Sequence, residues 1–155
     1  MIDSNHFNGG DVTPDTKLMQ AAIDIAKTEK TPFGAVLAMG DQIFVTAANQ
    51  TKALNDPTAH AELLAIRKLA EHLQKTDLSG FTLYTTCEPC PMCMSAAIWA
   101  GVDTVVYGCS ISTISKFMEQ IQIDCEFVNR NAFRKVETIG NFMKNECLKL
   151  LKRYA

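Results

Sequence analysis

The sequence has no long apolar run, little proline or glycine, and no excess of either charge. No stretch approaches the roughly 18 uninterrupted apolar residues of a membrane-spanning helix, so we expect no contact with a membrane. The 5 prolines and 8 glycines form no repeat or linker, which excludes fibrous and solenoid folds. With 47% hydrophobic residues and a formal net charge of -2, the 155 residues predict a folded domain and disfavour binding to a polyanion.

The N-terminal segment also lacks a basic cluster and an apolar core. Residues 1–12 therefore resemble a flexible polar tail rather than a secretory signal, and we expect a cytoplasmic protein with one domain over residues 1–155. In that compartment the 6 cysteines should be reduced, which favours metal binding or core packing over disulfides.

Hydrophobic periodicity predicts alternating helices and strands. The expected helices open at Pro14, with Thr13 as the N-cap, and at the 55–58 turn, and then cover 91–100, 114–123 and 141–154. Strands are expected at 33–39, 42–48, 81–86, 103–108 and 134–139. This order indicates helices packed on both faces of a mixed sheet.

The cysteines fall into two groups. Cys109, Cys125 and Cys147 stand alone in apolar or helical contexts and are expected in the core. Cys90 and Cys93 are three residues apart at the start of a predicted helix, so their sulfurs can hold one ion. The helix N-terminus favours the thiolate form that metals require.

A third ligand must come from another segment, and His60 is the best-placed of the 3 histidines. Two sulfurs, one imidazole and an open fourth position are typical of a catalytic zinc site, where the ion activates water. The alternative is a closed structural site in which Cys87 supplies the fourth ligand.

Glu62 is the candidate acid/base beside this metal. A carboxylate can take a proton from water and later give it to a leaving group. Residues two apart on a regular helix point to nearly opposite sides, so His60 and Glu62 can share a site only at an irregular first turn.

The H-x-E and P-C-x-x-C patterns are together typical of zinc-dependent nucleobase deaminases. The chain resembles the cytidine deaminase-like family in three stretches, PFGAV at 32–36, NDPTAHAE at 55–62 and CEPCPMC at 87–93. The resemblance covers residues 18–107 well and is similar to the branch that contains bacterial guanine deaminases and tRNA adenosine deaminases.

The resemblance implies a single deaminase domain with a three-layer α/β/α fold around a five-stranded mixed sheet. It also implies a role for each residue of this chain that stands at a position matching the family's motifs. Zn²⁺ is held by His60, Cys90 and Cys93, Glu62 is catalytic, and substrate contacts come from Asn49, Phe33, Ala61 and Trp99.

Three residues favour guanine as the substrate within this branch. Phe33 matches the ring that stacks on the base in guanine deaminases, and Trp99 and Cys87 point the same way. The Phe-Asp-Asp stretch of guanine deaminases is absent, and Glu119 or Asp124 is the acidic residue that could replace it.

The sequence therefore favours hydrolysis of guanine to xanthine and ammonia, by a homodimer that binds a small purine base or nucleoside. The first alternative is tRNA-specific adenosine-to-inosine deamination, although the net charge disfavours tRNA as a partner. A basic cluster on the last helix is more simply a solvated face. The second alternative is a zinc-binding module without catalytic activity.

Overall fold

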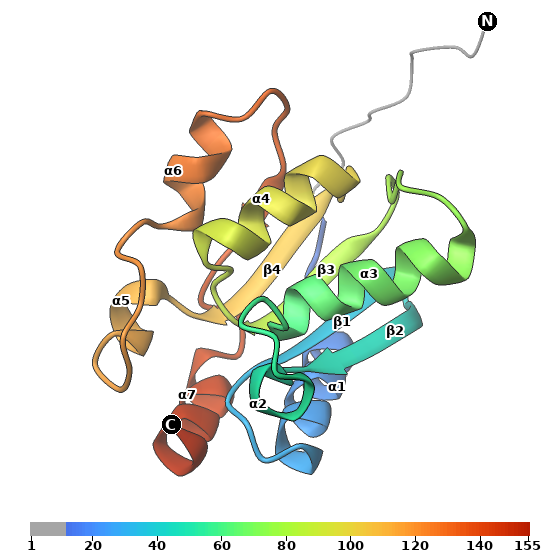
Figure 1. Ribbon diagram of the computed structural model, residues 1–155. Helices are drawn as coiled ribbons and strands as arrows, with labels where there is room; N and C mark the ends of the chain where they lie inside the picture. Colours follow the sequence, from blue (N-terminus) through green and yellow to red (C-terminus); the bar gives the residue numbers. More distant parts are fainter. Residues whose placement is uncertain (1–11) are drawn as a thin grey trace, which may run out of the picture.

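The computed structural model describes residues 12–155 and arranges them as a sheet between two layers of helices (Figure 1). The predicted tail, residues 1–12, lies outside the described residues except for Val12. No helix in the described part combines the length and apolar character needed to cross a membrane. The prediction of one domain over residues 1–155 stays a prediction.

The sheet has five strands in the order β2-β1-β3-β4-β5. β1 pairs with β2 and β3 in antiparallel register, whereas β3–β4 and β4–β5 are parallel, so the predicted mixed sheet is confirmed. The strands are β1 (Gly34–Met39), β2 (Gln42–Ala48), β3 (Thr82–Cys87), β4 (Thr104–Cys109) and β5 (Glu137–Ile139).

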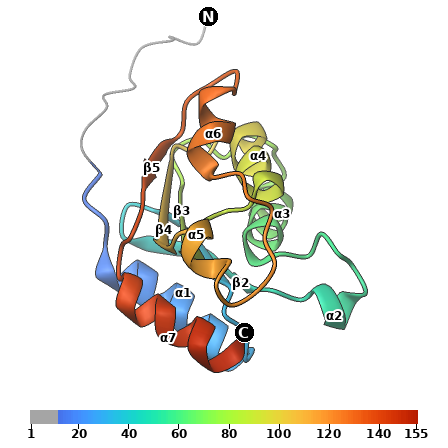
Figure 2. The same cartoon turned by 90° about the vertical axis from the view of Figure 1, so that its left-hand side faces the viewer.

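Helices cover both faces of this sheet, which confirms the three-layer α/β/α fold. α1 (Thr16–Thr28) and α7 (Lys144–Tyr154) lie side by side on one face (Figure 2). α3 (Ala61–Leu73) packs on the other face against β1 and β2, and α4 (Pro91–Ala100) packs beside α3.

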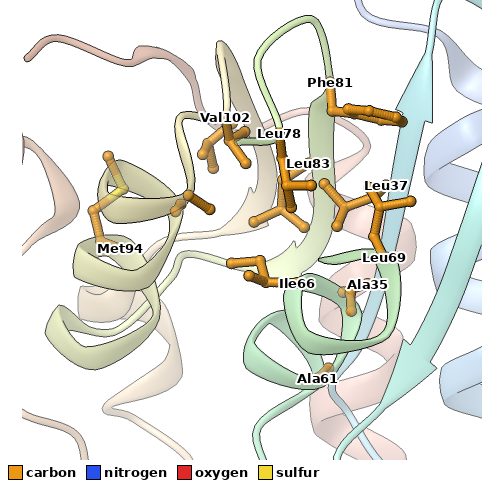
Figure 3. Packing of buried hydrophobic residues seen from close by; sticks show 14 of the residues in the cluster. Ala35, Leu37, Ala61, Ile66, Leu69, Leu78, Phe81, Leu83, Met94 and Val102 are labelled. Atoms are coloured by element: carbon orange, nitrogen blue, oxygen red, sulfur yellow. The ribbon is translucent and has the colours of Figure 1, made fainter. Parts of the chain in front are cut away.

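The strands β1, β3 and β4 are buried on both faces because helices cover each side. Between the sheet and α3, the side chains of Leu37 and Leu83 meet Ile66 and Leu69, and Met94 extends this core toward α4 (Figure 3). A second cluster lies under α1 and α7 and includes Cys147. The lone cysteines predicted for the core, Cys109, Cys125 and Cys147, are all buried, as expected.

The first helix starts two residues later than predicted. Asp15, not Thr13, is the N-cap of α1, and its carboxylate accepts a hydrogen bond from the Lys17 amide at 2.8 Å. The sequence also missed α2 (Thr51–Leu54), a single turn that ends at Asn55 in the left-handed conformation.

The predicted helix at 114–123 is wrong. Two short helices occur instead, α5 (Ile111–Ile114) and α6 (Cys125–Arg130), and each begins at a side-chain cap, Ser110 and Asp124 respectively. Most apolar side chains between them are exposed, so a helix there would bury little apolar surface. The exposed ones are Phe117, Ile121 and Ile123.

The last two elements are shorter than predicted. Only Glu137–Ile139 of the expected strand pairs with β4. The final helix starts at Lys144 rather than at Asn141, because Asn141 and Met143 have positive φ angles of 60° and 51° and cannot continue a right-handed helix.

Gly34 allows α1 to pack closely on β1, and its replacement is the first test of the structure. A Cβ at this position would fall on the carbonyl oxygen of Ala22 in α1. We expect Gly34→Ala to lower the free energy of unfolding by about 1–3 kcal/mol through overpacking, measured by urea denaturation. Lys27→Ala, exposed on the same helix, is the control and should change stability by less than about 0.5 kcal/mol. Equal effects of the two substitutions would contradict this packing.

Candidate active site

Two helix starts bring three metal-ligating side chains together. His60 is the N-cap of α3 and Cys90 the N-cap of α4, with Pro91 at the first helical position and Cys93 one turn along. The Nδ1 atom of His60 lies 3.6 Å from Sγ of Cys90 and 3.6 Å from Sγ of Cys93. Since an N-cap residue has extended backbone, both His60 and Cys90 project toward the space between the helix ends.

The three side chains fit a zinc ion. Zinc–sulfur and zinc–nitrogen bonds of ordinary length at tetrahedral angles place sulfur and nitrogen about 3.5 Å apart. Within residues 12–155, His60, Cys90 and Cys93 form the one group of three or more ligand-type side chains close enough to hold a metal. Cys87 is buried at the end of β3 and does not belong to that group, which disfavours a closed four-ligand site.

The lowered pKa of Cys90 favours its role as a metal ligand. A hydrogen bond from the Cys93 thiol, reinforced by one from His60, lowers the pKa of Cys90 to about 4 although burial raises it. The pKa of Cys93 is raised, first because of that bond to Cys90 and then because of burial. The interaction with Cys90 also raises the pKa of His60.

Glu62 lies in the first turn of α3, beside this cluster. Its side chain is buried, and burial raises the pKa of its carboxyl group. The Thr85 hydroxyl lies 3.0 Å from Oε1 of Glu62 and donates to it. Because His60 is an extended N-cap residue with φ -69° and ψ 154°, it and Glu62 can serve one site. This is the irregular first turn that the sequence required.

A tight loop holds the chain before His60. Oδ1 of Asp56 accepts hydrogen bonds from the amide and the hydroxyl of Thr58, at 2.8 and 2.6 Å. The hydroxyl of Thr58, followed by its amide, lowers the pKa of Asp56. Arg67 of α3 pairs with Asp56 at 3.4 Å, so the loop is tied to the helix that it precedes.

Three of the predicted substrate contacts lie along connected segments next to the metal cluster. The amide of Asn49 donates to the carbonyl of Phe33 at 3.2 Å, and the amide of Gln50 donates to the carbonyl of Ala59, next to His60. Phe33 is half-buried, whereas Ala61, the first residue of α3, is fully buried. Their roles as substrate contacts stay predictions.

Trp99 occupies a different position from these residues. It lies near the end of α4, nine residues after Cys90, which corresponds to about 13.5 Å along the helix axis. Its side chain is 77% exposed, and its ring centroid is 4.9 Å from that of Phe133. Together they line an apolar groove of about 460 Å³. A contact between Trp99 and the substrate stays a prediction.

Two threonines that the sequence reading did not single out support the site. Thr85 bonds to Glu62, and Thr86 accepts from the amide of Gly34 at 3.1 Å and donates to the carbonyl of Pro32 at 2.7 Å. Thr86 therefore holds the segment on both sides of Phe33. The available signal was the alternation of a strand, which directs two consecutive threonines to opposite faces of β3.

Two cysteines, one histidine and a buried glutamate at two helix starts define a zinc-dependent deaminase. Residues 12–109 match the family described as the cytidine and deoxycytidylate deaminase zinc-binding region, and the chain belongs to this family. The resemblance found in the sequence and the predicted zinc cofactor are thereby confirmed.

Relatives within this family act on different substrates. The chain is 35% identical over 147 residues to the tRNA-specific adenosine deaminase of Buchnera aphidicola, covering 90% of this chain and 87% of the relative. It is 47% identical to the guanine deaminase of Bacillus subtilis over 76 residues, 49% of each chain. A solved structure from a study of A-to-I editing by tRNA deaminases at the wobble position superposes with a TM-score of 0.76. That structure is 27% identical and is matched over 88% of this chain and 99% of its own.

Proposed function

We propose that the chain is a tRNA-specific adenosine deaminase, which converts adenosine to inosine and releases ammonia. The observation that carries the proposal is the extent of similarity. The match to the Buchnera enzyme runs over 90% of this chain, whereas the match to the guanine deaminase covers 49%. The proposal therefore follows the alternative left open by the sequence rather than its preference for guanine.

In this proposal the chain's own residues bind the metal, orient the base and move the proton. His60, Cys90 and Cys93 hold zinc, which when bound makes water a nucleophile at neutral pH. Glu62 takes a proton from that water and delivers it to the base, so that the amino group leaves as ammonia. Its buried carboxylate is suited to both steps, because burial raises its pKa toward neutrality.

Local charge supports an RNA substrate despite the net charge of -2. Lys30 and Lys52 line a groove of about 430 Å³ that also contains Asn49 and Tyr154. The groove also contains Gln50, whose amide bonds to the carbonyl of Ala59 next to His60. Its two lysine ammonium groups can contact phosphates. Glu29 is the one acidic residue among those lining it.

The test compares an anticodon stem-loop RNA bearing a wobble adenosine with free guanine. We expect inosine and ammonia from the RNA, with a rate at sub-saturating substrate that falls steeply as salt rises. Lys30→Gln combined with Lys52→Gln should weaken RNA binding and flatten its salt dependence. Lys17→Gln with Lys75→Gln, two exposed lysines elsewhere, is the control. No inosine from RNA, or equal salt dependence in both variants, would contradict the proposal.

Guanine is the second candidate substrate, because the identity of 47% to the guanine deaminase is higher within the shorter matched region. Under this candidate the same assay yields xanthine and ammonia from guanine. The rate should then depend little on salt, because the base carries no phosphate.

A homodimer and a cytoplasmic location are also proposed. Both extend the sequence-based predictions, and light scattering over a range of protein concentrations measures the oligomeric state directly.

A further inference from the structure

Glu88, two residues before Cys90, makes contacts that the zinc chemistry does not use. Its side chain is buried, and its two carboxylate oxygens accept backbone hydrogen bonds from two separate segments. Oε2 accepts from the amide of Ile111 at 2.7 Å, and Oε1 accepts from the amide of Cys125 at 2.8 Å. Hydrogen bonds to a charged acceptor are among the stronger ones in proteins.

These two amides belong to Ile111 and Cys125, the first residues of α5 and α6. Each helix also has its own cap, since Ser110 accepts from the amide of Thr113 and Asp124 from that of Phe127. These capping bonds stabilise each helix internally, but they do not connect it to residues 88–90, the metal-ligand loop between β3 and α4. The Glu88 carboxylate provides that tie to both helices at once.

The tied helices lie at the edge of the sheet where the site is built. Cys87 and Cys109 pair at the ends of the parallel strands β3 and β4, and the amide of Glu88 donates to the carbonyl of Cys109 at 2.7 Å. Ligand crevices of α/β sheets lie outside the carboxyl ends of such strands. One strand end leads to Cys90, the N-cap of α4, and the other leads to α5. Figure 1 shows α5 at the left of the molecule.

The segment held in this way follows the part of the chain that the family shares. The family match ends at Cys109, and α5 and α6 come directly after it. Glu88 and the starts of α5 and α6 line a cavity of about 330 Å³ together with Tyr107 of β4. This cavity, next to the zinc-binding motif in the chain, is therefore lined mainly by residues outside the family match, and Glu88 within the match holds them through its two hydrogen bonds.

We propose that Glu88 is a positioning residue for substrate recognition. Its carboxylate holds the α5–α6 segment, residues 110–131, against the metal-ligand loop and so fixes the wall that a bound substrate meets. The inference rests on the proposed deaminase function, but it holds for either substrate. It concerns where the wall lies, not which base reacts.

The experiment measures KM and kcat for Glu88→Gln and Glu88→Ala with whichever of RNA and guanine the wild type deaminates. Ala removes both bonds and Gln retains one acceptor oxygen. We expect KM to rise by about tenfold or more in Glu88→Ala and by less in Glu88→Gln, with kcat within about threefold and zinc near one per chain. Amide hydrogen exchange should become faster in 110–131 and remain unchanged in β1 and β3.

A second variant loosens the same segment without altering the metal-ligand loop. Ser110→Ala with Asp124→Ala removes both internal caps, and we expect it to raise KM in the same way. Asp77→Ala is the control, because Asp77 also accepts a backbone hydrogen bond, from Ser79 at 3.0 Å, in a loop outside this segment. It should leave KM and exchange in 110–131 unchanged.

Two outcomes would overturn the inference while leaving the proposed function in place. One is an unchanged KM both in Glu88→Ala and in the double-cap variant, Ser110→Ala with Asp124→Ala. The other is a loss of zinc in Glu88→Ala with no change of KM in the double-cap variant, which would make Glu88 part of metal retention. Failure of the wild type to deaminate any substrate counts instead against the proposed function. Unchanged exchange in 110–131 for Glu88→Ala would then overturn the positioning role separately.

Discussion

Glu62→Gln is expected to reduce turnover by about 10²–10⁴-fold while zinc stays near one per chain. The amide has nearly the shape of the carboxylate and can still accept the hydrogen bond that Thr85 donates. It cannot take a proton from water, so the proton-transfer step is lost and the metal cluster is kept. Steady-state ammonia release and zinc analysis of the same preparation measure both quantities.

The matched control is Glu71→Gln, which makes the same change on the exposed side of α3. It should leave turnover unchanged. A non-catalytic zinc-binding module would respond equally to the two substitutions. Equal turnover of Glu62→Gln and wild type would therefore remove Glu62 from the mechanism.

Cys90→Ala and His60→Ala are expected to lower bound zinc to well below one per chain and to abolish turnover. Each leaves two of three ligands, and a catalytic zinc site has no spare protein ligand to replace the one removed. Loss of the metal should also lower the thermal midpoint, because metal binding adds to the free energy of folding. Atomic absorption and calorimetry on the same samples test the two effects together.

Cys87→Ala is the control for these ligand variants. Cys87 is buried in the apolar core at the end of β3, and it does not belong to the group of side chains close enough to hold a metal. It should retain zinc near one per chain. Zinc loss equal to that of Cys90→Ala would indicate a closed structural site instead.

Cys90 and Cys93 could be predicted as metal ligands because their determinants are local. His60 comes from another segment, and it could be chosen among the 3 histidines because it belongs to an H-x-E pattern. The spacing of Cys90 and Cys93 and the proline between them specify a helix start, and a helix start places both sulfurs on one side. Because His60 and Glu62 are two residues apart, the sequence also predicted that they could act together only at an irregular first turn of the helix. The extended N-cap conformation of His60 meets that condition.

The supporting contacts could not be predicted, because they join residues distant in sequence. Glu88 bonds to amides 23 and 37 positions later, and Thr86 bonds to a carbonyl 54 positions earlier. Residues 111–131 were misread for a related reason. Their apolar side chains gave a weak helical signal, whereas the caps at Ser110 and Asp124 and the bonds to Glu88 decide where the helices begin.

The meeting of α3 and α4 at their N-termini also explains how the fold tolerates a buried acid next to a cluster of sulfurs. With zinc bound, the thiolates of Cys90 and Cys93 would cancel the formal double charge of the ion, which would leave the Glu62 carboxylate as the uncompensated anion. Each helix start carries a partial positive charge of about half a unit, so the two backbones together can offset one such anion. Peptide dipoles at the two helix starts would thus supply a counter-charge for this carboxylate.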